Sequence, residues 1–223
     1  MKRAMNDETF LQRHGTLLGL FLCVLVPLIL FGLLADAVHD KQPFAFDQPI
    51  MAALHARSTP LLDTLMVGAS VAAGPYGLLG FNLAIFFYVL WRRKMHAATF
   101  WVLATGGALL LNLLTKAVFQ RTRPSFWESI APEYSYSFPS GHAMCSMASA
   151  AALVVLFRRS QWRMHVTVIA VFCVLMVGVA RPYLGVHYPS DILAGWTAAL
   201  AWVVGLAISG AHARRWREGR SAP

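Results

Sequence analysis

The chain has 223 residues, of which 57% are hydrophobic and only 13% are charged, whereas an ordinary soluble domain carries roughly 25% charged residues. Its apolar residues come in long blocks that a bilayer can absorb and a small globular core cannot, so we expect one multi-span membrane domain. A net charge of +9 would suit a nucleic-acid partner only if the basic residues shared one continuous face. They stand instead in short clusters between apolar blocks, so we expect membrane lipids and no nucleic acid as partners.

Six apolar stretches reach or approach the roughly 20 residues that a spanning helix needs. The predicted spans are about 17–35, one crossing within 64–91, then 95–115, 141–157, 164–180 and 192–211. The second stretch is longer than one crossing requires, so we expect its early part to lie along the interface. The chain start resembles a signal peptide, but its apolar run is long enough to span and carries no convincing cleavage signal. We therefore predict an uncleaved first helix.

The three cysteines indicate neither a disulfide framework nor a metal site. Cys23, Cys145 and Cys173 each lie inside an apolar stretch, and their spacing matches no metal-ligand pattern. We expect small core or lipid-facing residues and no disulfide.

The positions of Lys and Arg predict the orientation in the membrane, because retained cytoplasmic loops are enriched in these residues. With six spans, thirteen of the nineteen basic residues fall on one side: Lys2, Arg3, Arg13, Arg92, Arg93, Lys94, Arg158, Arg159, Arg163, Arg214, Arg215, Arg217 and Arg220. We predict a multi-pass protein of a bacterial cytoplasmic (inner) membrane with both termini cytoplasmic. Its parts are a cytoplasmic N-terminus (1–16), a six-span domain (17–211) with an extracytoplasmic loop at 36–60, and a cytoplasmic tail (212–223).

The first polar segment at the opposite side is KAVFQRTRP, which covers residues 116–124. Lys116 and Arg123 stand seven residues apart, and Pro124 ends any helix. Basic residues placed against the orientation pattern at a membrane boundary need a specific reason; the others on this side are Lys41, Arg57, Arg121 and Arg181. Taken alone, the pair is explained more simply as interfacial side chains that snorkel.

The second polar segment, SFPSGHAM, comes just before the fourth predicted span and contains the site segment 139–142. Ser140 can cap that helix, and Gly141 lets a ligand approach the backbone closely. Free N–H groups at a helix start bind anions, and His142 in the first turn would face the bound anion. An ordinary capped helix with an interfacial histidine explains this segment equally well on its own.

The third polar segment, ARPYLGVHYPSD, joins the last two spans and contains the site segment 181–191. Arg181 offers a planar fork suited to phosphate oxygens. His187 and Asp191 are four residues apart, but Pro189 between them predicts a turn, with Asp191 in the first turn of the last span. From there the carboxylate can accept the Nδ1–H of His187 and leave Nε2 free as a nucleophile. A surface histidine beside a helix-terminal aspartate is the alternative.

The three segments are most informative together, because they fall at the same predicted face of the membrane. They supply three cations, a helix-start anion site, two histidines and one carboxylate. A phosphoryl-transfer site needs this set: donors that stabilise the equatorial oxygens, a nucleophile with an orienting base, and an acid for the leaving group. The sequence therefore predicts an all-α bundle of six transmembrane helices with an active site at the extracytoplasmic ends of helices 3 to 6.

The pattern K-x6-RP at 116–124, PSGH at 139–142 and R-x5-H-x3-D at 181–191 resembles the three-part signature of the type 2 phosphatidic acid phosphatase superfamily. That family includes bacterial phosphatidylglycerophosphate phosphatases, undecaprenyl pyrophosphate phosphatases, glucose-6-phosphatases and vanadium haloperoxidases. The chain departs from it at Ala180, where many members carry Ser. Gly141 stands where some undecaprenyl pyrophosphate phosphatases have Asp, which favours the broader lipid phosphatase group.

The resemblance implies a role for each matching residue. His187 would attack phosphorus with Asp191 in support, and His142 would protonate the leaving group. The phosphate would be held by Lys116, Arg123, Ser140, Gly141 and Arg181. The cations would replace the charge stabilisation that a metal supplies elsewhere, so neither a metal nor another cofactor is expected.

The implied function is hydrolysis of a lipid phosphate monoester or pyrophosphate, such as phosphatidic acid, phosphatidylglycerol phosphate, undecaprenyl pyrophosphate or a lipid A phosphate. The alternatives are an anion or lipid transporter with a basic gate, which would need ionisable residues near span centres that the chain lacks, and a haloperoxidase-like oxidase. The sequence indicates neither the physiological lipid nor the oligomeric state.

Overall fold

The computed structural model describes residue 19 and residues 21–220, so the predicted cytoplasmic N-terminus and the start of the first span lie outside the described residues. Within them the chain is helical and contains no strand, which confirms the all-α prediction. A short π-helix, η1 (Phe21–Leu25), runs into α2 (Val26–His39). The remaining helices are α3 (Asp47–His55), α4 (Pro60–Ala72), α5 (Pro75–Trp91), α6 (Met95–Phe119), α7 (Gly141–Phe157), α8 (Arg163–Tyr183) and α9 (Pro189–Arg220).

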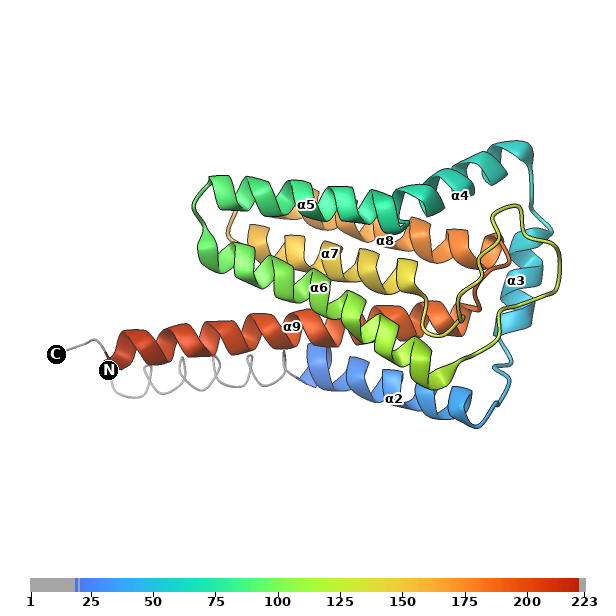
Figure 1. Cartoon of the computed structure of the whole chain (residues 1–223), viewed down its shortest axis with the longest axis horizontal. Coiled ribbons are helices and arrows are strands. Elements are labelled where there is room, and N and C mark those ends of the chain that lie inside the picture. The colour runs from blue at the N-terminus through green and yellow to red at the C-terminus, as the bar shows by residue number, and fades with distance from the viewer. Residues whose placement is uncertain (1–18, 20, 221–223) are drawn as a thin grey trace, which may run out of the picture.

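Helices α2 and α5 to α9 run side by side, and the shorter α3 and α4 lie at one end of them (Figure 1). The long segment between α6 and α7 loops over this same end. Helix α7 lies inside the bundle, in contact with α6, α8 and α9. The connections α5–α6 and α7–α8, which carry two of the basic clusters, lie at the opposite end.

Small residues allow the central helices to pack closely. Trp101 and Ala108 of α6, Met144 and Ala148 of α7, and Ala199 of α9 belong to one buried cluster. In a bilayer, where lipid tails are as apolar as the core, such close packing supplies much of the association energy. The site at the end of the bundle is therefore supported by closely packed helices.

Of the described helices, four are long and apolar enough to cross a membrane: those at Leu22–His39, Met95–Phe119, Arg163–Tyr183 and Pro189–Gly210. Helices α4 and α5, bent by 51° at their junction, make a fifth if they are counted together. Helix α7 is apolar but has only 17 residues, short of the roughly 20 that cross the hydrocarbon core. The count of six spans thus stays a prediction.

Several boundaries differ from the sequence-based expectation. Helix α8 reaches Tyr183, so Arg181 lies in its last turn and not in the connection to α9. The second apolar stretch is broken between α4 and α5, where Gly74 caps the second helix and Pro75 opens it; proline has no N–H with which to continue a helix. Helix α6 reaches Phe119, which places Lys116 in its last turn. Helix α9 continues to Arg220, beyond the predicted end of the span at 211, and no proline interrupts it after Pro189.

Candidate active site

The three motif segments meet at the end of the bundle where α3 lies. Ser140 caps α7, as predicted, with its Oγ accepting the N–H of Ala143 at 3.5 Å. The backbone N–H of Ser140 donates to the carbonyl of Asp191 at 3.1 Å, so the starts of α7 and α9 are joined directly. Asn112 of α6 donates to the Pro139 carbonyl at 3.1 Å. These backbone links hold the second motif between the other two.

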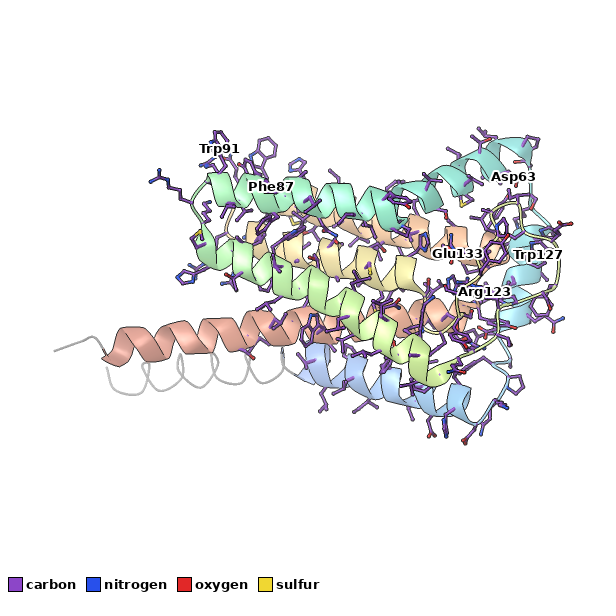
Figure 2. All side chains as sticks on the ribbon, viewed as in Figure 1. Asp63, Phe87, Trp91, Arg123, Trp127 and Glu133 are labelled. Atoms are coloured by element: carbon purple, nitrogen blue, oxygen red, sulfur yellow. The ribbon has the colours of Figure 1, made fainter. Side chains whose placement is uncertain are left out.

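The side chains of the motifs converge on a carboxylate that no motif contains. Glu133, in the segment between α6 and α7, accepts a hydrogen bond from Arg123 at 2.7 Å and another from Arg181. Its Oε1 lies 3.5 Å from His142 Nδ1, and its Oε2 lies 3.8 Å from His187 Nε2. Figure 2 shows Glu133 and Arg123 close together at this end of the molecule. Two arginines and two histidines thus surround one anionic group.

His187 is fully buried, and its two ring nitrogens face different partners. Nε2 lies 3.1 Å from Nη1 of Arg123; a guanidinium can only donate, so Nε2 is the acceptor and the ring proton is assigned to Nδ1. Nδ1 lies 3.4 Å from Oδ2 of Asp191 and 3.4 Å from Oγ of Ser137. The Nε2 lone pair is therefore directed toward Arg123 and Glu133.

Asp191 lies in the first turn of α9, as the sequence predicts, and is completely buried. Its Oδ2 accepts hydrogen bonds from Ser137 Oγ at 2.5 Å and from the backbone N–H of Tyr188 at 3.0 Å. Its Oδ1 accepts a hydrogen bond from Arg121 at 2.5 Å. The carboxylate is held on both oxygens beside the ring of His187.

The remaining predicted residues lie around the same point without touching Glu133. Lys116 donates to Ser135 Oγ at 3.0 Å and to the Tyr136 carbonyl at 2.6 Å. Gly141 approaches α6 so closely that a Cβ there would lie 3.0 Å from Asn112 Oδ1. A larger residue would require the Asn112 side chain or the start of α7 to shift.

Burial and local charge shift the pKa of two site groups outside the helices, His187 and Glu133. Burial, together with the charges of Arg123 and Arg181, holds the pKa of His187 well below its ordinary value, so the imidazole is neutral. Burial raises the pKa of Glu133, but the surrounding positive charge, to which Arg181 contributes most, outweighs it and lowers that pKa to about 2. Glu133 is therefore ionised, and the site binds an anion next to a neutral imidazole.

An apolar cavity of about 1020 Å³ leads away from the site. It runs between α5 and α6, where its walls include Leu79, Phe86 and Leu109. At the site end it reaches Glu133 and His142. The cavity joins the charged groups to a long apolar space within the helices.

The sequence signature of the PAP2 superfamily matches residues 97–217, which is more than half of the chain and contains all three motifs. The chain belongs to the PAP2 superfamily. It is 33% identical to phosphatidylglycerophosphatase B of Bacillus subtilis over 77% of this chain and 87% of that protein. It is 25% identical to undecaprenyl-diphosphatase of Sulfolobus acidocaldarius over 87% of this chain and 89% of that one.

Among solved PAP2 structures, the chain resembles the crystal structure of the transmembrane PAP2-type phosphatidylglycerolphosphate phosphatase from Bacillus subtilis. The TM-score is 0.74 at 28% sequence identity, and the match covers 82% of this chain and 92% of that one. With its apolar helices, this chain is a multi-pass membrane protein of a lipid phosphatase family. The family predicted from the three motifs is confirmed.

Two groups of PAP2 site residues in this chain escaped the sequence analysis. Glu133 lies in an irregular segment with no motif to mark it, and Ser137 opens the second polar segment, SFPSGHAM, but was assigned no role. Arg121 was among the basic residues against the orientation pattern, but it was assigned no role, and nothing in the sequence distinguishes its partner Asp47 from Asp36 and Asp40 in the same loop. For Arg121, the usable signal was that a basic residue stands on the predicted extracytoplasmic side, against the orientation pattern.

Proposed function

We propose that the chain is an integral membrane phosphatase that hydrolyses a lipid phosphate monoester or pyrophosphate through a phosphohistidine at His187. The observation that carries this proposal is the position of Glu133. Its carboxylate is bound by Arg123 and Arg181 within 3.5 Å of His142 Nδ1 and 3.8 Å of His187 Nε2. An anion at this point meets a nucleophile, an acid and two cations, and a substrate phosphate would take the place of the carboxylate.

In the first step the Nε2 lone pair of His187 attacks phosphorus, an N–P bond forms and the bond to the lipid oxygen breaks. Asp191 holds the Nδ1 proton and stabilises the positive ring. Protonated His142 gives its proton to the departing oxygen. Arg123, Arg181 and the N–H groups at the start of α7 stabilise the three equatorial oxygens. We propose the same role for Lys116, Ser140 and Gly141, because they match the phosphate-binding positions of the family's motifs.

In the second step water attacks the phosphohistidine. His142, now neutral, takes a proton from that water, the N–P bond breaks, and inorganic phosphate leaves. The lipid product is an alcohol, or a lipid monophosphate when the substrate is a pyrophosphate. The fixed cations supply the charge stabilisation, so we expect activity in the presence of a metal chelator.

The cavity between α5 and α6 supports a lipid as the substrate. A phosphate bound by Arg123 and Arg181 would have its leaving group on the His142 side, where the cavity begins. An acyl or prenyl tail can then lie along Leu79, Phe86 and Leu109, where it stays in apolar surroundings like those of the bilayer that it leaves. We propose that the tail enters sideways from the bilayer through this space.

We also propose that the site faces the periplasm or exterior and that both termini are cytoplasmic. The basic connections α5–α6 and α7–α8 lie at the end of the bundle opposite the site, and basic loops remain in the cytoplasm. Reporter fusions after Arg93 and after Ala131 test this: a periplasmic phosphatase reporter should be active only at the second position. Activity of the first fusion alone would reverse the orientation.

The test of function is phosphate release by the full chain in detergent across a panel of phosphatidic acid, phosphatidylglycerol phosphate, undecaprenyl pyrophosphate and lipid A. We expect His187→Ala and His142→Ala to lose more than about 1,000-fold in kcat. His96→Ala, an exposed histidine at the start of α6, should retain full activity. Normal turnover by folded His187→Ala would refute the phosphohistidine, and no release from any panel lipid would refute the substrate class.

A further inference from the structure

A second charged cluster lies behind the candidate nucleophile, away from the phosphate position. Arg121 bridges two carboxylates: Nη1 donates to Oδ1 of Asp191 at 2.5 Å, and Nη2 donates to Oδ2 of Asp47 at 3.1 Å. Both carboxylates are buried, with Asp191 at 0% and Asp47 at 4% exposure. Asp47 belongs to α3, which contains none of the three motif segments. The cluster therefore links α3 to the base of the catalytic pair.

Asp47 also holds the first turn of α9. Its Oδ1 accepts the backbone N–H of Ser190 at 2.8 Å, and its Oδ2 accepts the Ser190 hydroxyl at 2.6 Å. Ser190 directly precedes Asp191, so these bonds fix the backbone from which the catalytic carboxylate projects. A carboxylate at a helix start is also favoured by the helix dipole. Burial raises the pKa of Asp47, while its bonds to Ser190 and Arg121 favour the ionised form.

Arg121 holds the other side of the same turn. Its guanidinium lies 4.1 Å from the ring centroid of Tyr188 and 5.6 Å from that of Phe44, within the range of cation–π attraction. Tyr188 follows His187 directly, and its N–H donates to Asp191. Arg121 thus contacts both Tyr188, which follows the nucleophile, and Asp191, the carboxylate that orients His187.

We propose that Asp47 and Arg121 are positioning residues that align the Asp191 carboxylate with His187, so that helix α3 controls the reactivity of the nucleophile. Neither residue contacts Glu133, which lies at the phosphate position, so neither is expected to bind substrate. Because Asp191 makes bonds on both oxygens, loss of the Oδ1 bond lets the carboxylate rotate away from Nδ1. His187 then loses its oriented partner while the phosphate contacts persist. The inference rests on the proposed function.

The test uses the full chain in detergent and the panel lipid that it hydrolyses fastest. We expect Asp47→Asn and Arg121→Gln each to lower kcat about tenfold or more, the effect of one hydrogen bond to a charged group, with KM within about twofold. The Ki of inorganic phosphate should be unchanged within about twofold. Arg121→Lys, which keeps the charge, should recover part of the lost kcat.

A double variant measures whether the two residues act together. Since Asp47 and Arg121 act through one carboxylate, the loss in the double variant should be clearly smaller than the product of the two single losses. Asp63→Asn is the matched control. That carboxylate accepts the Tyr183 hydroxyl at 2.5 Å and links α4 to α8, yet it touches neither Arg121 nor Asp191, so its kcat should stay normal.

The outcomes separate this inference from the proposed function. Full kcat in Asp47→Asn beside an inactive His187→Ala overturns the positioning role alone. A large rise in the Ki of phosphate in Arg121→Gln assigns Arg121 to phosphate binding and also overturns it. Equal losses of kcat in Asp63→Asn and Asp47→Asn would mean that any damage to this end of the bundle has the same effect, which refutes the inference. Normal activity of His187→Ala would refute the phosphohistidine mechanism of the proposed function.

Discussion

Replacing Glu133 by glutamine removes the negative charge that Arg123 and Arg181 hold at the phosphate position, with almost no change in volume. The carboxylate and a substrate phosphate would use the same donors, so they compete. The pKa of Glu133 is lowered from an ordinary 4.5 to about 2, which corresponds to a net preference of about 3 kcal/mol for the ionised carboxylate at this position. The side chain is 26% exposed and the amide still hydrogen-bonds, so we expect a smaller part of it to appear in phosphate binding.

The assay is inhibition of lipid phosphate hydrolysis by inorganic phosphate. We expect the Ki of phosphate to fall about tenfold in Glu133→Gln. Glu128→Gln is the control, because Glu128 is exposed on the same segment and has no hydrogen bond or ion pair with the site arginines. An unchanged or higher Ki in Glu133→Gln would refute the reasoning, since the carboxylate would then not compete with phosphate.

Three further predictions follow from the same contacts. Since the pKa of Glu133 is lowered in the folded chain, its ionised form stabilises the fold above about pH 4.5 and loses this effect as the pH falls to about 2. The difference in melting temperature between wild type and Glu133→Gln should therefore shrink over that pH range. A constant difference would contradict this prediction. Ser137→Ala removes a 2.5 Å hydrogen bond to Asp191 and should lower kcat about tenfold at constant KM in steady-state assays. Gly106 lines the cavity, and a Cβ there meets no atom within 4 Å. Gly106→Trp should therefore lower kcat/KM for long-chain phosphatidic acid but not for short-chain phosphatidic acid. Gly80→Trp, on α5 outside the cavity lining, should change kcat/KM for neither lipid.

Local sequence information was enough to predict the backbone of the second motif segment and the end of the third, because residues adjacent in sequence shape it. Ser140 caps α7 as expected, and Pro189 opens α9 so that Asp191 falls in its first turn. Capping and proline geometry act within about four residues. Hydropathy likewise predicted an all-helical membrane chain, since the bilayer imposes length and apolarity on each span separately. The break at Gly74 was only half anticipated, as an interfacial early part of the stretch.

What the sequence by itself determined is the family, the helical class and the residues from which a phosphoryl site can be built. Only the tertiary structure decided that Glu133 lies among these residues and that Asp47 and Arg121 lie behind Asp191. Glu133 reaches the two arginines, and Asp47 reaches Arg121 across 74 positions, because charges in a region of low dielectric select partners by distance in space and not along the chain. No pattern in the irregular segment after α6 or in the first loop records those partners, since their positions depend on how the helix ends pack.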